Sequence, residues 1–235
     1  MIRHVSFDNW GTVIKGNPEY FLLRAKYLKS KYELDSNIFG FGRILNGIVE
    51  KTGFEILPDV RFCLIMNCAG IPDENIDLED WKLVHEEILE KAPPILIDQN
   101  FSTVISRLYD LGISTSILCN TSNIAGSYFR RYFKKLGIDF LFQIYSNESI
   151  IAKPNPRIFN LMRGLSRVDP AEILHVGDNK ITDFDSAIYA GMNSILFEEN
   201  LPQYERIFDY IKSEQSDDGS CQIQSDSKYS NPDSL

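Results

Sequence analysis

The sequence predicts an α/β fold, in which a parallel sheet carries helices on both faces and a small α-helical cap subdomain is attached. Three observations indicate this fold. With 235 residues, 43% of them hydrophobic, the chain can bury a sizeable core. Its second half alternates segments of helical periodicity with short apolar runs, which is typical of parallel strands joined by helices. Between its first apolar run and that alternation, apolar residues recur only at helical spacing.

The expected elements follow in chain order. Residues 2–7, IRHVSF, suit a buried strand because Ile, Val and Phe fill a strand that is covered on both faces. Residues 18–91 predict helices alone, with NPE and LED as start signals. After APP at 92–94, helix and short strand alternate, beginning with FSTVISRLYDLG and then ISTSILCN. Because Gly112, Gly137 and Gly191 stand where these helices should stop, we predict a Rossmann-like sheet.

Changes of pattern along the chain predict three regions. Residues 1–15 and 93–212 form the α/β core, and residues 16–92 form the helical cap. From 213 to 235 the chain is rich in Ser, Asp and Gln and has almost nothing to bury. We therefore expect residues 213–235 to be a disordered polar tail.

Charge and apolar patterning narrow the class of partner. The formal net charge is −9 and the pI is about 4.9, so the average surface repels phosphate backbones and anionic lipids. No apolar stretch approaches the roughly 18 residues that cross a bilayer, and the opening MIRH leads straight into a strand rather than a signal-peptide core. We expect a cytoplasmic protein that binds a small, anionic molecule, with neither nucleic acid nor membrane as partner.

Polar residues follow every expected strand at its carboxyl end, where open α/β sheets bind ligands. Asp8 follows the first strand, and the later strands are followed by NTSN at 120–123, AKPNP at 152–156 and DNKITD at 178–183. Carboxylates gathered in one crevice repel and raise one another's pKa unless a cation lies among them. A hard divalent ion with oxygen ligands fits best, most simply Mg²⁺, with Lys153 as a second positive charge at the rim.

Four motifs in this order resemble those of the haloacid dehalogenase superfamily of hydrolases, over nearly the whole chain except the tail. They are DNWGT at 8–12, ILCNTSN at 117–123, AKPNP at 152–156 and GDNKITD at 177–183. The resemblance implies that Asp8 attacks the substrate and forms an aspartyl intermediate, which water then hydrolyses. It also implies that Lys153 neutralises charge on Asp8 and on the transferring phosphoryl group.

The same resemblance implies a magnesium site and a mobile cap. Asp8, the backbone carbonyl of Trp10 and Asp178 would ligate Mg²⁺, while Asp183 would orient metal-bound water or act from the second shell. Trp10, Cys119, Asn120 and Thr121 would contact the substrate. The cap would close over the site and select the substrate. Four cap cations could reach an anionic group, and the sequence leaves open which of them points inward: Arg24, Lys26, Arg43 and Arg61.

Two positions depart from the pattern of the family. Trp10 stands where its phosphatases carry a second Asp as general acid and base, and loss of such a group costs about 10²–10⁴-fold in rate. Cys119 stands where they carry a phosphate-binding Ser or Thr. Two registers remain open, one with Cys119 as the functional residue and one with Thr121. His175, in a core strand, is expected to be a packed, hydrogen-bonded histidine rather than a catalytic one.

Three functions remain open. The most favoured is a Mg²⁺-dependent phosphatase that acts on a small phosphorylated metabolite. The alternative is a 2-haloacid dehalogenase-type hydrolase, because that branch carries an aromatic residue at the place of Trp10, although a branch without a metal does not need the acidic pair of GDNKITD. The third is a binding protein of the same fold whose catalysis is weak or lost.

Overall fold

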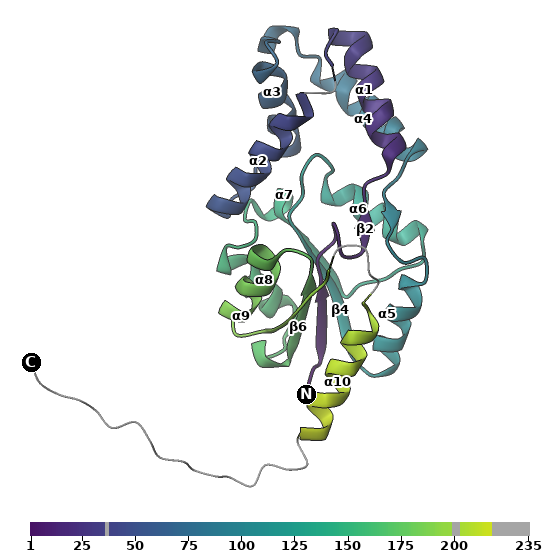
Figure 1. Cartoon of the computed structure of the whole chain (residues 1–235), viewed down its shortest axis with the longest axis vertical. Helices are drawn as coiled ribbons and strands as arrows, with labels where there is room; N and C mark the ends of the chain where they lie inside the picture. The colour runs from purple at the N-terminus through teal and green to yellow at the C-terminus, as the bar shows by residue number, and fades with distance from the viewer. Residues whose placement is uncertain (36–37, 199–202, 218–235) are drawn as a thin grey trace, which may run out of the picture.

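The computed structural model describes residues 1–35, 38–198 and 203–217 of the chain (Figure 1). Its core is a five-stranded sheet in the order β5-β4-β1-β6-β7, and all its paired strands are parallel. The strands are β1 (His4–Phe7), β4 (Ser114–Cys119), β5 (Phe142–Tyr145), β6 (Ile173–Gly177) and β7 (Asn193–Leu196). The central strand β1 is buried throughout, as a parallel strand covered on both faces should be.

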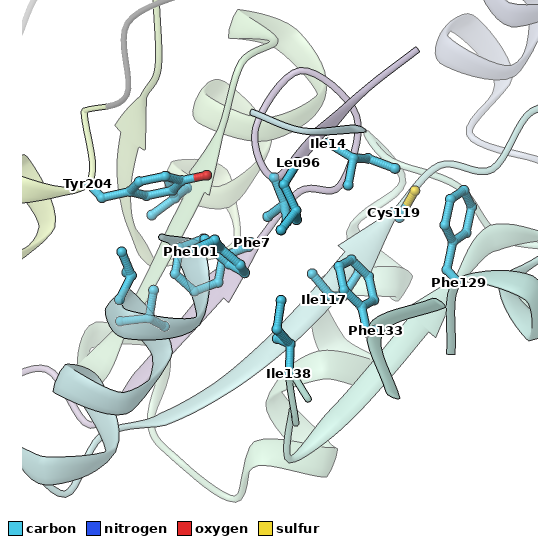
Figure 2. Packing of buried hydrophobic residues seen from close by; sticks show 14 of the residues in the cluster. Phe7, Ile14, Leu96, Phe101, Ile117, Cys119, Phe129, Phe133, Ile138 and Tyr204 are labelled. Carbon is cyan, nitrogen blue, oxygen red and sulfur yellow. The ribbon is translucent and has the colours of Figure 1, made fainter. Parts of the chain in front are cut away.

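Helices cover both faces of this sheet, so the predicted fold class is confirmed. The core helices are α5 (Phe101–Asp110), α6 (Gly126–Lys135), α7 (Ser146–Ser149), α8 (Pro156–Ser166), α9 (Ser186–Tyr189) and α10 (Glu205–Asp217). Figure 1 shows α8 and α9 on one face and α5 and α10 on the other. Successive residues of β4 face opposite ways, since Ile117 and Cys119 join one apolar cluster and Leu118 joins the other. Figure 2 shows the larger cluster, with Phe7 between Phe101 and Ile117.

The cap consists of α1 (Pro18–Tyr32), α2 (Phe39–Thr52), α3 (Pro58–Cys68) and α4 (Leu78–Lys91). In Figure 1 these helices lie beyond the carboxyl ends of the strands. They have an apolar cluster of their own, in which the Trp81 ring stacks on Phe62 at 4.3 Å and on His85 at 4.6 Å between ring centroids. A buried cluster separate from that of the sheet gives the cap its own source of stability.

Short elements that the sequence pattern did not predict complete the structure. The antiparallel pair β2 (Ile14–Lys15) and β3 (Ile95–Leu96) joins the segment that enters the cap to the segment that leaves it. The 3-10 helices are η2 (Asp73–Asn75) and η3 (Pro170–Glu172), and η4 (Lys180–Asp185) is a π-helical turn. None of the helices in the described ranges is both long and apolar enough to span a membrane.

The boundary of the expected tail needs one correction. Helix α10 continues to Asp217, so residues 213–217 are helical rather than disordered. The helix packs on the sheet through Ile207, Phe208 and Ile211. This packing stabilises the helix, which continues into the segment where the composition becomes polar. Residues 218–235, the rest of the expected tail, lie outside the described residues.

Candidate active site

Asp8 lies directly after β1, at the centre of the carboxyl edge of the sheet. Its backbone N–H donates to the carbonyl of Val176 at 2.8 Å, and its side chain is 9% exposed. The chain then turns at Gly11, whose φ is +73°, a conformation that residues with a side chain rarely adopt. A Cβ atom on Gly11 would lie 2.0 Å from Oδ2 of Asp178. Glycine therefore permits both the turn after Asp8 and the close approach of a second carboxylate.

Three carboxylates converge at this edge. Asp178 follows β6, Asp183 lies in η4, and one carboxylate oxygen from each of Asp8, Asp178 and Asp183 lies within 4.8 Å of the others. A second glycine makes room here, because a Cβ on Gly177 would lie 2.3 Å from Cγ of Asp183. Because Gly11 and Gly177 have no side chain, the carboxylates of Asp178 and Asp183 can lie close to the backbone and to Asp8.

Lys153 supplies the positive charge of this cluster. It lies in the loop between α7 and α8, is 1% exposed, and its Nζ donates to Oδ1 of Asp8 at 2.7 Å and to Oδ1 of Asp183. Burial opposes its charge, but attraction to Asp183 and Asp8 raises the pKa of Lys153 above its ordinary value. Lys153 is therefore held as a cation against two carboxylates.

The carboxylates of Asp8 and Asp183 are shifted in opposite directions. Burial raises the pKa of Asp8 to about 7, with Asp183 and Asp178 adding to the shift and Lys153 opposing it. Burial also acts on Asp183, but Lys153 and His175 outweigh it and hold the pKa of that carboxyl below its usual range. Asp183 accepts three hydrogen bonds, from Lys153, from His175 and from the backbone N–H of Asn179 at 3.0 Å. Asp183 is thus a fixed, ionised group behind Asp8.

His175 links the strand β6 to this cluster. Its Nε2 lies 3.2 Å from Oδ1 of Asp183 and its Nδ1 lies 3.2 Å from Oγ of Ser6. Because burial lowers the pKa of His175, the ring is neutral. Its Nε2–H then donates to Asp183 and its Nδ1 accepts from the hydroxyl of Ser6, so both ring nitrogens have a partner. The sequence indicated a packed histidine, and the structure shows one; its contact with Asp183 had no signal in the sequence.

Asn120 has a role that the sequence did not indicate. Its Nδ2 donates to the carbonyl of Lys153 at 2.7 Å, and its Oδ1 accepts the N–H of Lys153 at 2.7 Å. This reciprocal pair joins the end of β4 to the loop that carries Lys153. Asn120 also lines the cavity described below, so it lies where a substrate contact was expected. The amide fixes the backbone from which the Lys153 ammonium is presented.

The structure separates the two residues between which the register was left open. Cys119 is fully buried in the apolar cluster, its thiol donates to the carbonyl of Asn120 at 3.3 Å, and it is absent from the cavity wall (Figure 2). We therefore remove Cys119 from the expected substrate contacts. Thr121 lines the cavity, but its hydroxyl contacts Oε2 of Glu55 at 3.3 Å and Oγ of Ser146 at 3.1 Å. Neither side chain is thus a simple replacement for the usual phosphate-binding hydroxyl.

Trp10 forms part of the cavity wall. Its ring packs edge-to-face on Phe129, with the centroids 5.6 Å apart and the planes at 82°. Aromatic pairs of this geometry add to the stability of a wall beyond the area they bury. The indole therefore offers an apolar surface at the place where the related phosphatases carry an acid.

A buried ion pair of the cap contacts the core through the carboxylate of Glu55. Oε1 of Glu55 accepts from Nη2 of Arg61 at 3.0 Å, and neither side chain is exposed. Oε2 of Glu55 accepts from Ser146 and Thr121, and Nη1 of Arg61 donates to Asn46 at 2.7 Å. The sequence pattern missed Glu55, because a single acidic residue in a cap loop has no distinguishing spacing.

A cavity of about 530 Å³ lies over the acidic cluster, between the sheet edge and the cap. Its core wall includes Asp8, Trp10, Asn120, Thr121, Lys153, Asp178 and Asp183. Helices α1 and α2 supply the opposite wall, where Arg24 is a cap cation with a place on the lining. Arg61 is committed to Glu55, and Lys26 and Arg43 are exposed and off the wall.

The residues present fit a divalent cation. If all three carboxylates and Lys153 are ionised, the cluster carries −3 + 1 = −2, which one Mg²⁺ balances. Carboxylate oxygens are the ligands that hard cations prefer, and burial beside like charges already raises the pKa of Asp8. Within the residues that the structure describes, Asp8, Asp178 and Asp183 are the group whose oxygens converge closely enough to share one ion.

Comparisons with known proteins bear on the family and the fold. A family model described as a haloacid dehalogenase-like hydrolase matches residues 2–191. The curated haloacid dehalogenase-like hydrolase domain-containing protein 3 of Xenopus laevis is 27% identical over 93 residues, which are 40% of this chain and 37% of that protein. The chain thus matches little more than a third of that relative's length.

Two solved structures share the fold. A predicted phosphoglycolate phosphatase from Haemophilus somnus 129PT is 18% identical, with a TM-score of 0.61 over 86% of this chain and 89% of that one. The defluorinating L-2-haloacid dehalogenase Rha0230 is 16% identical, with a TM-score of 0.64 over 86% of this chain and 83% of that one. At these identities the likeness concerns the fold, and it includes both a phosphatase and a dehalogenase.

Proposed function

The chain belongs to the haloacid dehalogenase-like hydrolases, and from this membership we propose that it is a Mg²⁺-dependent phosphatase that acts on a small phosphorylated metabolite through an aspartyl-phosphate intermediate. One observation carries the proposal. Asp8, Asp178 and Asp183 converge on one edge of the sheet with Lys153 among them, and the cluster faces a cavity of metabolite size. Such a set of charges suits phosphoryl transfer, in which catalysis is mostly positioning and electrostatics.

Asp8 is the nucleophile in this proposal. A carboxylate oxygen of Asp8 bonds to phosphorus while the ester P–O bond breaks, and the alcohol oxygen leaves with the electron pair of that bond. Water then attacks the aspartyl phosphate, which releases inorganic phosphate and restores the Asp8 carboxylate. Lys153 already binds Oδ1 of Asp8, so Oδ2 is the attacking atom that we assign. The Lys153 ammonium also offsets the negative charge that collects on the transferring group.

Asp8, Asp178 and the backbone carbonyl of Trp10 are the proposed ligands of Mg²⁺. When bound, the ion supplies Lewis-acid neutralisation of phosphoryl charge. Asp183 is assigned to the second shell, because Lys153, His175 and the N–H of Asn179 already engage its oxygens. Residues 16–92 are the proposed cap that closes over the site, and Glu55 of this cap contacts Ser146 and Thr121 of the core.

Trp10 determines which leaving groups the site handles well. An indole donates no proton to a departing alkoxide, and absence of that proton costs about 10²–10⁴-fold in rate. Acyl and aryl phosphates need little protonation of the leaving group, so we expect them to react much faster than alkyl phosphates. The proposed mechanism therefore predicts a preference for acyl and aryl phosphates over alkyl phosphates.

Turnover of p-nitrophenyl phosphate and acetyl phosphate, with and without Mg²⁺, tests the proposal. We expect metal-dependent release of phosphate that Asp8→Asn abolishes. Asp185→Asn is the matched control, because Asp185 lies in the same segment as Asp183 but is exposed and pairs with Lys180. No phosphate release from a folded protein, or release that Asp8→Asn leaves intact, would refute it.

Dehalogenation is the second candidate, and the aromatic wall at Trp10 is the observation that favours it. In that reaction Asp8 bonds to carbon, halide leaves with the electron pair of its bond, and water hydrolyses the resulting ester. Metal-independent release of chloride from 2-chloropropionate would support it over the phosphatase. If neither phosphate nor chloride is released, the result supports the third hypothesis, a binding protein of this fold whose catalysis is weak or lost.

A further inference from the structure

Three donors hold the Asp183 carboxylate, and His175 is one of them. Oδ2 accepts the backbone N–H of Asn179 at 3.0 Å, whereas Oδ1 accepts from both Lys153 and Nε2 of His175, the latter at 3.2 Å. Of these three donors, His175 is the one that lies in a strand, because Asn179 lies in the turn after β6 and Lys153 in the loop before α8. His175 therefore ties this carboxylate to the central sheet, the kind of element that holds a functional group most accurately.

The ring of His175 is itself held on two sides. It is fully buried, and its Nδ1 lies 3.2 Å from Oγ of Ser6, the residue directly opposite it on the neighbouring strand β1. Phe159 of α8 packs edge-to-face on the ring, with the centroids 5.7 Å apart and the planes at 89°. A ring fixed by a hydrogen bond and by an aromatic neighbour presents Nε2 to Asp183 at a constant position.

A neutral donor suits this place better than a charged one. Burial is the main cause that lowers the pKa of His175, and the charge of Lys153 lowers it further, although the hydrogen bond to Asp183 opposes the shift. Because the neutral imidazole carries no charge, it orients Asp183 without cancelling the negative charge of that carboxylate. Asp183 therefore attracts the Lys153 ammonium with its full charge.

We propose that His175 is a positioning residue for the reaction at Asp8. Its Nε2–H fixes the Asp183 carboxylate, and that carboxylate fixes the Lys153 ammonium against Oδ1 of Asp8. The role of Lys153 in the reaction is taken from the proposed phosphatase function, on which this inference rests. The chain of contacts runs from β6 to the nucleophile, and it keeps the ammonium on one oxygen of Asp8 so that the other is left to attack.

The tautomer of the His175 ring provides the first test. Nε2 must carry the proton in order to donate to Asp183, and Nδ1 must then accept from Ser6. The chemical shifts of the ring nitrogens in ¹H–¹⁵N NMR of the wild-type protein distinguish the two tautomers, and His175→Gln identifies the signals by their absence. We expect the proton on Nε2. A proton on Nδ1 alone would overturn the proposal, and the measurement needs no enzyme activity.

Two substitutions separate the two nitrogens of His175. The amide of Gln reaches as far as Nε2 and can donate to Asp183, whereas the shorter amide of Asn reaches only as far as Nδ1 and keeps the contact with Ser6. We expect His175→Asn to lower kcat for p-nitrophenyl phosphate about 10- to 100-fold, the usual cost of losing a partner that orients a functional group. KM should change little, because Lys153 acts mainly on charge that develops during the reaction. His175→Gln should recover most of the lost kcat, and a purely structural role would not predict this recovery.

His4→Asn is the matched control. His4 is also fully buried and lies on the same face of β1 as Ser6, and its ring nitrogens contact Ser114 at 2.7 Å and Ser116 at 2.8 Å. The same chemical change is thus made at a second buried histidine, whose serine partners lie outside the acidic cluster. Urea denaturation should show a loss of stability in both His4→Asn and His175→Asn, whereas kcat of His4→Asn should equal that of the wild type.

The placement of Lys153 can also be followed without activity. Its ammonium is buried against two carboxylates, so we expect its protons to exchange slowly with water and to give a ¹H–¹⁵N signal, which Lys153→Met identifies by its absence. We expect this signal to shift or to disappear in His175→Asn. It should stay as in the wild type in His4→Asn.

Four further results would overturn the proposal. They are a kcat of His175→Asn equal to that of the wild type, a kcat of His175→Gln as low as that of His175→Asn, an equal fall of kcat in His4→Asn, and a Lys153 signal that His175→Asn leaves unchanged. If His175→Asn does not fold, the tautomer decides together with His175→Gln, which overturns the proposal if it folds but loses both kcat and the Lys153 signal. If the wild-type protein does not hydrolyse p-nitrophenyl phosphate, the phosphatase proposal fails by itself, and the two NMR measurements still decide whether His175 positions Lys153.

Discussion

The buried pair of Glu55 and Arg61 allows a stability prediction to be worked out from its contacts. Arg61→Met removes the guanidinium and leaves the Glu55 carboxylate buried, since neither side chain is exposed. Oε1 of Glu55 then keeps one donor, the N–H of Ile56 at 2.9 Å, while Oε2 keeps Ser146 and Thr121. Breaking a buried pair on one side costs about 3–5 kcal/mol, and the remaining donors place this case near the lower end.

We therefore expect Arg61→Met to lower the free energy of unfolding by about 3 kcal/mol. For a chain of this length, that loss corresponds to a fall of about 6–12 °C in Tm. Urea denaturation followed by circular dichroism measures the free energy, and a thermal scan measures Tm. The double variant Glu55→Gln/Arg61→Met should be more stable than Arg61→Met alone, because it also removes the uncompensated charge.

Arg131→Met is the matched control. Arg131 of α6 pairs with Glu86 of α4 at 2.6 Å, but both side chains are about half exposed. Surface pairs contribute about 0–1 kcal/mol, so Arg131→Met should change stability by less than about 1 kcal/mol. The reasoning is wrong if Arg61→Met costs no more than Arg131→Met, or if the double variant is as unstable as the sum of its single variants predicts.

Three further predictions concern the metal, the Lys153 loop and acid stability. Mg²⁺ at 100 times its Kd stabilises a protein by about 2.7 kcal/mol, so saturating Mg²⁺ should raise Tm by about 5–11 °C, and Asp178→Asn should remove most of that shift in a thermal scan. Asn120→Ala removes both hydrogen bonds to the backbone of Lys153, so kcat for p-nitrophenyl phosphate should fall about tenfold in steady-state kinetics, with a smaller change in KM. Burial, with His175 nearby, lowers the pKa of His4 from 6.5 to about 4. The unfolded chain therefore binds a proton below pH 6.5, whereas the folded chain binds it only below about pH 4. This difference of 2.5 pH units lowers the free energy of unfolding by up to about 3 kcal/mol as the pH falls from 6.5 to 4. Urea denaturation across that pH range measures the loss.

Different results contradict each of these three. The metal site is wrong if the Asp178→Asn protein responds to Mg²⁺ as the wild type does. The role of Asn120 in positioning Lys153 is wrong if kcat of Asn120→Ala equals that of the wild type. The acid prediction fails if replacing His4 with Gln leaves the loss of stability between pH 6.5 and pH 4 as large as in the wild type.

The sequence was sufficient for the local features of this protein. Apolar runs and helical periodicity reflect which residues can be buried within a single element, so the parallel sheet and the helical cap could be predicted. The carboxyl ends of parallel strands meet at one edge, so Asp8, Lys153 and Asp178 could be expected near one another. Those expectations need only the order of elements and the positions of their ends.

Contacts between distant segments required the tertiary structure. Asn120 binds a backbone 33 positions away, and Glu55 reaches Ser146 across 91 positions. Arg24 and Arg61 are both buried arginines of the cap, yet Arg24 lines the cavity and Arg61 does not. Which of two similar side chains turns toward a cavity depends on how the helices pack, and packing is decided by the sum of many weak contacts. The residues proposed to carry the chemistry could therefore be predicted from local pattern, whereas the contacts that hold them in place depend on how the cap and the sheet pack together.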